Sequence, residues 1–194
     1  GEGREFMLTP RHRIALMYPL LSSTQLPSVR MATDGASADI RSTCFCGALH
    51  VVVSQHARTV GASICHCSTC RSLSGAPFLA NVLFGKEDAA LRLAGSDGEP
   101  PADALIVQDT SRHVKRIRCA RCYSPLLALL GGKRVVVPLA CFGKDAVPES
   151  WRPQQHIWYD KRVMDVLDGV PKYRKNFGGE RCSDAGLPLA EDVS

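Results

Sequence analysis

Three tight groups of cysteines constrain this chain more than any other feature of its sequence. The groups are Cys44 with Cys46, then Cys65, Cys67 and Cys70, and finally Cys119 with Cys122. The chain has nine cysteines. An odd count and spacings of Cys-x-Cys and Cys-x-x-Cys favour metal binding in a reducing compartment over a disulfide framework. We therefore expect seven metal ligands and a cytoplasmic protein.

Two cysteines fall outside these groups. Cys141 lies in the apolar run of residues 135–142, where we expect a buried small hydrophobic residue, and Cys182 lies in a polar segment with no predicted role.

The first and third groups together supply four thiolates. Cys44 and Cys46 project from the same face of an extended segment, because side chains at i and i+2 of a strand point the same way. Cys119 and Cys122 form a Cys-x-x-Cys knuckle of the kind found in zinc ribbons. Two plus two thiolates make a closed, structural zinc site.

The middle group supplies only three thiolates, and three protein ligands with an open position are typical of a catalytic zinc. Two alternatives stay open. A fourth protein ligand closes the site, from His66, His113, His156 or Cys141, or two of the middle thiolates pair with Cys44 and Cys46. His66 alternates with Cys65 and Cys67 and faces away from them if this segment is extended.

Positive charge surrounds the cysteine groups. The net charge is +5, and no acidic residue occurs between Asp39 and Glu87 or between Asp109 and Asp145. Those two windows hold all seven clustered cysteines and twelve basic residues. Cations offset the charge of thiolates bound to zinc, and any excess attracts an anionic ligand.

Hydrophobic patterning predicts a mainly β domain with short helices. Its 194 residues, 45% of them hydrophobic, suit one globular domain. Short apolar runs separated by glycine and proline predict strands in residues 48–53, 78–84, 104–108, 126–130, 134–140 and 156–159, and residues 68–75 favour one or two helical turns. The apolar stretch 126–142 is broken by two glycines, Lys133 and Arg134, so we expect no membrane span.

The ends of the chain differ from its centre. We predict a zinc domain over residues 41–175, an N-terminal extension over 1–40 and a polar, irregular tail over 176–194. Residues 7–30 lack acidic residues and contain arginines, which suits a mitochondrial presequence, although three prolines interrupt a long amphipathic helix. The extension is thus either a targeting segment or a remnant of cloning.

Four segments resemble one family, the glutathione-dependent formaldehyde-activating enzymes and centromere protein V. They are CFCGALHVVV, CHCSTCRSLSGAPF, RIRCARCYSPL and HIWYDKRVMDVLDGVPKY, in the family's order. The resemblance implies an Mss4-like (β-tent) fold with two zinc ions. It implies a structural zinc on Cys44, Cys46, Cys119 and Cys122, and a catalytic zinc on Cys65, Cys67 and Cys70.

The sequence departs from this family in two places. Tyr123 stands where the family usually has glycine after the last knuckle, and CFGKDAVPE replaces a Gly-Ser/Thr-Leu-Asp-Asp stretch, keeping Asp145. Both departures concern the substrate more than the metals, and a side chain at position 123 is close enough in sequence to reach toward a site.

The resemblance implies that the chain adds the glutathione thiol to formaldehyde, as an S-hydroxymethylglutathione synthase-like carbon–sulfur lyase. Arg71, Arg116, Arg118 and Tyr123 are candidate ligands for glutathione or another anionic substrate. His156 and Asp145 are candidate proton-transfer groups.

Other functions stay open. One is a zinc-dependent lyase or hydrolase for another small anionic metabolite at the same three cysteines. Another is a nucleic-acid or chromatin-binding module using the basic window 112–121, which lacks interleaved aromatic residues. A third is a structural protein with two closed zinc sites. A homo-oligomer is compatible with each.

Overall fold

The structure is a computed structural model that describes residues 39–93, 98–143 and 146–189. Most of the predicted N-terminal extension, and Asp145, therefore lie outside the described residues.

Strands dominate the described part of the chain, as the sequence predicts. A three-stranded sheet has the order β1-β2-β5, with bounds Ile40–Thr43, Leu49–Val53 and Ala89–Leu93. A nine-stranded sheet has the order β12-β11-β10-β3-β4-β9-β8-β7-β6, with bounds Arg181–Cys182, Lys172–Tyr173, His156–Ile157, Thr59–Cys65, Leu79–Gly85, Arg134–Pro138, Pro125–Leu130, Val114–Cys119 and Leu105–Ser111. Neighbouring strands are antiparallel, except that β10 runs parallel to β3 and β11.

Helical structure is short. In the described residues, α1 (Ser68–Ser74) is the one α-helix, and single 3₁₀ turns η1 to η5 cover Lys86–Asp88, Ala102–Ala104, Leu139–Cys141, Glu149–Trp151 and Tyr159–Lys161. None of these helices is long and apolar enough to cross a membrane.

One hydrophobic core joins the two sheets. Leu49, Val51 and Val53 of β2 are buried because alternate residues of a strand share a face. Phe84 of β4 packs edge-on against Trp151, with ring centroids 4.8 Å apart, and Trp151 is 1% exposed. Cys44 and Cys119 belong to the same core. The ends of β1 and β7 are therefore held together by apolar packing as well as by their thiols.

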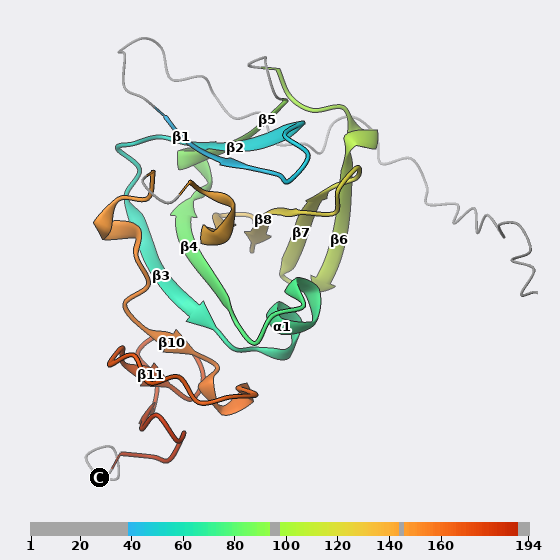
Figure 1. Cartoon of the computed structure of the whole chain (residues 1–194). Helices are drawn as coiled ribbons and strands as arrows, with labels where there is room; N and C mark the ends of the chain where they lie inside the picture. Colours follow the sequence, from blue (N-terminus) through green and yellow to red (C-terminus); the bar gives the residue numbers. More distant parts are fainter. Residues whose placement is uncertain (1–38, 94–97, 144–145, 190–194) are drawn as a thin grey trace, which may run out of the picture. The chain divides into compact units, whose positions relative to one another are not determined.

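The helix α1 connects β3 to β4 (Figure 1). Its N-cap is Cys67, whose Sγ accepts a hydrogen bond of 3.3 Å from the Cys70 N–H. The helix ends at Gly75, which has φ +67° and so suits glycine. The same short helix thus carries two of the three middle cysteines, one at its cap and one in its first turn.

Several elements differ from the sequence prediction. Six strands in the described part of the chain were not predicted: β1, β3, β5, β7, β11 and β12. β3 was missed because it contains Gly61 and Ser63, and β7 because it is rich in basic residues. The predicted strand 156–159 ends at Ile157, since Trp158 turns the chain with φ +55°. The tail is not wholly irregular: β12 pairs with β11, and Cys182 is buried.

Candidate metal centres

The four-cysteine centre joins two turns that are far apart in sequence. Cys44 and Cys46 follow β1, and Cys119 and Cys122 lie at the end of β7. The four Sγ atoms all lie within 4.8 Å of one another, with 3.5 Å between Cys44 and Cys46 and 3.7 Å between Cys46 and Cys119. Sulfurs about 2.3 Å from a tetrahedral zinc are about 3.8 Å apart. The four thiols therefore fit a tetrahedral zinc site in which the protein fills all four coordination positions.

One hydrogen bond joins the two turns of this centre, from the Phe45 N–H to Ser124 Oγ at 3.0 Å. A second, from the Tyr123 N–H to the Cys119 carbonyl at 2.9 Å, closes the turn that carries Cys119 and Cys122. Tyr123 has φ +62°, a left-handed conformation that suits the glycine expected there. Its side chain is 64% exposed. The structure thus places this predicted substrate-binding residue on the four-cysteine centre, facing solvent.

The three-cysteine centre is built at the start of α1. Cys65 ends β3, Cys67 caps the helix and Cys70 lies in its first turn. Their Sγ atoms lie within 4.8 Å of one another, and Cys65 and Cys70 are buried. In the described part of the chain, no fourth cysteine, histidine or carboxylate joins this group. Three thiols with no fourth protein donor fit a zinc site of the open type.

The thiols of this centre share their protons unequally. Hydrogen bonds from Cys65 and Cys70 hold the pKa of Cys67 well below its usual value, against the opposing effect of burial. The nearby Arg116 guanidinium lowers it further. In turn, hydrogen bonding to Cys67 and Cys70, together with burial, raises the pKa of Cys65. A thiolate at Cys67 is a ready first ligand for a cation.

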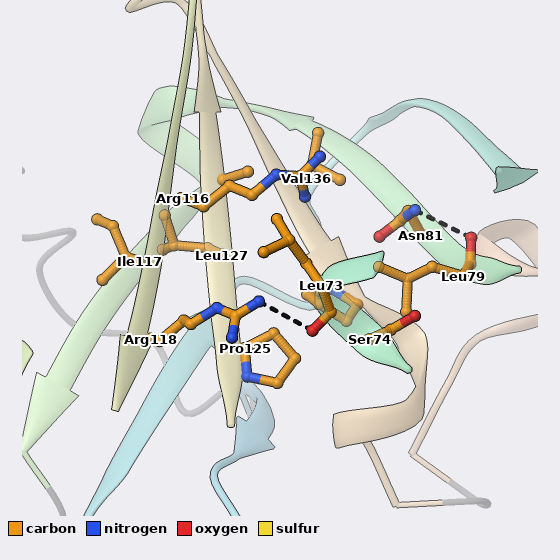
Figure 2. Close-up of a pocket in the computed structure, with 12 residues that line it drawn as sticks. Leu73, Ser74, Leu79, Asn81, Arg116, Ile117, Arg118, Pro125, Leu127 and Val136 are labelled. Carbon is orange, nitrogen blue, oxygen red and sulfur yellow. Dashed lines mark hydrogen bonds between the residues drawn. The ribbon is translucent and has the colours of Figure 1, made fainter. Parts of the chain in front are cut away.

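Two arginines of β7 reach from the sheet to α1. Arg116 Nη2 lies 3.6 Å from Cys70 Sγ, and Arg118 Nη2 donates to the Leu73 carbonyl at 2.9 Å. Figure 2 shows both guanidinium groups in the pocket between α1 and strands β7, β8 and β9. Its inner volume is about 20 Å³, room for about one water molecule. A group that enters it is small, and larger parts of a ligand lie outside.

The sequence model of a family described as glutathione-dependent formaldehyde-activating enzyme matches residues 39–161. This match covers more than half of the chain and contains all seven clustered cysteines. The chain belongs to this family. No curated protein matches the sequence. Membership implies an enzymatic function connected with glutathione and formaldehyde, and it confirms the predicted resemblance.

The mainly β fold with two cysteine groups is also confirmed, and it is compatible with the Mss4-like zinc fold of the glutathione-dependent formaldehyde-activating family. Both cysteine groups can bind metal ions, in the same two sets that the spacing predicts.

The other predicted site residues of this family member have protein partners. Arg71 Nε donates to the His66 carbonyl at 3.0 Å, so this arginine fastens the metal-binding loop. His156 has no exposed surface, and its Nδ1 and Nε2 atoms lie 2.8 Å from His66 and from Asp168. The predicted proton transfer between His156 and a substrate is not supported, because both ring nitrogens are engaged inside the protein.

The alternative fourth ligands lie elsewhere. His113 is exposed in the turn between β6 and β7, and His66 faces His156. Cys141 is only half-buried and points its Sγ toward the Pro125 carbonyl at 3.5 Å, so the prediction of a buried residue is wrong.

Sequence reasoning missed the charged residues around His156. Asp168 and Lys172 form an ion pair of 2.8 Å, and Lys172 forms a second one of 2.8 Å with Asp184. The sequence carries no signal for this cluster, because the burial of Lys172, which is 3% exposed and so needs a carboxylate partner, is seen only in the folded chain. Its spacing to the cysteines gives no hint of their relation.

Proposed function

We propose that this chain is a zinc-dependent carbon–sulfur lyase that adds the glutathione thiol to formaldehyde or a related small carbonyl. The observation that carries the proposal is the three-cysteine centre, which has no fourth protein donor among the described residues and lies against Arg116. Cys65, Cys67 and Cys70 would hold the catalytic ion. The four-cysteine centre would hold a second, structural zinc.

The reaction needs a thiol and an aldehyde to meet in one orientation. The sulfur bonds to the carbonyl carbon, the carbon–oxygen double bond becomes single, and the thiol proton ends on the new hydroxyl oxygen. When bound, zinc supplies positive charge that favours a thiolate or polarises a carbonyl.

The chain's own residues contribute positive charge beside the three-cysteine centre. Arg116 contacts Cys70 and also lines the pocket, so it lies between the metal ligands and the space for a substrate. Arg118 lines the same pocket. Guanidinium groups bind carboxylates through paired hydrogen bonds, and the two carboxylates of glutathione suit them.

Exchange of one ligand tests this proposal. Cys67→Ser keeps an oxygen for the N-cap of α1 while it removes a thiolate. We expect the purified zinc-loaded variant to lose one of two zinc ions and to convert glutathione and formaldehyde no faster than buffer. The matched control Cys141→Ser lies outside both centres and should keep both ions and the wild-type rate.

Because thiols and formaldehyde also combine spontaneously, the wild-type rate must exceed that of buffer. A zinc-loaded wild type with no such excess contradicts the proposed reaction.

A second candidate is a zinc-dependent lyase or hydrolase that acts on another small anionic metabolite at the three-cysteine centre. Arg116 and Arg118 in one narrow pocket support it, because they suit an anion of any origin. A panel of small carboxylates and esters, with the same Cys67→Ser and Cys141→Ser pair, distinguishes it from the first. Turnover that needs no glutathione favours this second function.

A further inference from the structure

A chain of hydrogen bonds and ion pairs, buried at His66, His156 and Lys172, connects the three-cysteine centre to the C-terminal part of the molecule. His66 Nε2 lies 2.8 Å from His156 Nδ1, and His156 Nε2 lies 2.8 Å from Asp168 Oδ2. Lys172 Nζ is 2.8 Å from Asp168 Oδ1 and 2.8 Å from Asp184 Oδ1. We call these five residues the His66–Asp184 network; its two carboxylates are partly exposed, with 31% of the Asp168 side chain and 45% of the Asp184 side chain accessible. Its first member stands between Cys65 and Cys67 in the sequence.

The carboxylate of Asp168 determines which atoms donate and which accept in this series of hydrogen bonds. A carboxylate only accepts hydrogen bonds, so His156 Nε2–H donates to Asp168. Burial lowers the pKa of His156 and favours its neutral form, whose Nδ1 accepts from His66 Nε2–H. This assignment leaves His66 Nδ1 without a proton. No partner for this atom occurs in the described part of the chain, although it is buried. The other contacts of the ring must therefore hold it in place, since an unpaired buried acceptor is destabilising.

Those other contacts fix His66 on every side. Its ring packs against Phe78 and Tyr159, with centroid distances of 5.4 Å and 4.9 Å. Its N–H donates to the Ile157 carbonyl at 3.0 Å, and its carbonyl accepts from Arg71. A residue held by ring, N–H and carbonyl also fixes the direction of the residues on either side of it. Here those neighbours are two thiol ligands.

Ion pairs of Lys172 hold the end of the network that lies far from the cysteines. Lys172 is 3% exposed, and a buried ammonium is tolerated only with close partners. Its two carboxylates fill that role, and Asp168 is thereby held against His156. Asp168, Lys172 and Asp184 all follow residue 161, where the family match ends. The charged end of this support thus lies beyond the family match, although Asp168 and Lys172 fall in the segment HIWYDKRVMDVLDGVPKY that resembles the family.

We propose that Asp168 and Lys172 are positioning residues that, through His156 and His66, set the metal affinity of the three-cysteine centre. This inference rests on metal binding at Cys65, Cys67 and Cys70 as proposed above. The physical basis is preorganisation: hydrogen-bonded partners behind the ligands hold the thiols in binding geometry before metal arrives, and loss of such partners typically weakens metal binding 10- to 100-fold.

The test is a titration of the full-length, metal-free protein with Co²⁺, followed by its thiolate absorption and by competition with a chelator. Asp168→Asn keeps the shape of the side chain but removes its charge, and it should weaken one of the two sites by roughly tenfold. The other site should be unchanged. Asp184→Asn acts one step further away and should weaken the same site to a smaller degree.

Asp165→Asn is the matched control. Asp165 lies in the same loop as Asp168 and pairs with Arg162 at 2.6 Å, outside the His66–Asp184 network. Its metal binding should equal that of the wild type. Equal affinities for the wild type and a folded Asp168→Asn variant would overturn the inference.

A different result of the same titration would contradict the proposed function. If the wild type binds one Co²⁺ and Cys67→Ser binds the same amount, the three cysteines hold no metal. Thermal unfolding of each variant shows whether it is folded at the temperature of the titration. Should Asp168→Asn be unfolded there, Asp184→Asn decides, because unchanged affinity in that variant contradicts the inference as well.

Discussion

Single residues in this chain carry two tasks at once. Cys67 is both a candidate metal ligand and the N-cap of α1. Arg116 contacts Cys70 and lines the pocket. Each double role restricts which substitution separates one task from the other, and Cys67→Ser is such a substitution.

Tyr123→Gly should stabilise the protein. A left-handed conformation costs an L-residue about 1 to 2 kcal/mol, and the greater unfolded-state entropy of glycine offsets part of the gain. We expect the free energy of unfolding to rise by about 0.5 to 1 kcal/mol, measured by urea denaturation of the zinc-loaded protein. Tyr123→Phe keeps the strained backbone and serves as the control. A glycine variant no more stable than the phenylalanine variant would count against this account.

At the scale of elements, the metal ligands come from the ends of strands. Cys65 ends β3, and Cys119 ends β7. β10 lies between β3 and β11 and runs parallel to both, which sets His156 beside the metal loop. The short strands near the C-terminus therefore belong to the support of the site.

Acid should reveal the contribution of this C-terminal support. Burial by itself raises the pKa of Asp168, but hydrogen bonds from Lys172 and His156 outweigh it and hold this pKa well below its usual range. A carboxyl with a lowered folded pKa stabilises the protein above its unfolded pKa of about 4, and this stabilisation is lost as pH falls toward the folded value.

The difference in free energy of unfolding between wild type and Asp168→Asn should thus be constant above about pH 5 and shrink below about pH 4. Denaturant titrations across this range measure it, with Asp165→Asn as the control. A difference that stays constant down to pH 2 would contradict the ion pair as the cause.

At the scale of the whole molecule, the four-cysteine centre joins segments that the core also brings together. Cys44 and Cys119 are part of the hydrophobic core that the two sheets share. Structural zinc sites contribute free energy directly to folding, on the order of 10 kcal/mol in small zinc peptides. The three-cysteine centre lies at the start of a seven-residue helix and spans only residues 65–70.

The two centres should respond differently to ligand loss. Cys119→Ala should unfold the domain, or lower its melting temperature steeply, whereas Cys67→Ser should leave a folded protein with one zinc. Circular dichroism and metal quantitation on the same samples make the comparison. Equal unfolding of both variants would remove the distinction between a structural and a catalytic centre.

Sequence predicts the cysteine sets because ligand chemistry depends on residue type and short spacing. It predicts strands such as β4 and β8, where apolar residues are consecutive. It misses β7, since Lys115, Arg116 and Arg118 obscure its pattern.

The support of the site could not be predicted from the sequence. The Asp168 to His66 connection depends on β10 packing beside β3, and His66 and His156 are 90 residues apart. No local pattern records such a pairing, so only the folded chain reveals it.

The ion pair of Lys172 with Asp184 matters for the choice of where a shortened form of this chain ends. A fragment that ends at residue 161, where the family match ends, keeps all seven clustered cysteines but lacks Asp168, Lys172 and Asp184. If the inference holds, such a fragment binds metal at the three-cysteine centre more weakly than the 194-residue chain does, because of the truncation and not because of the ligands.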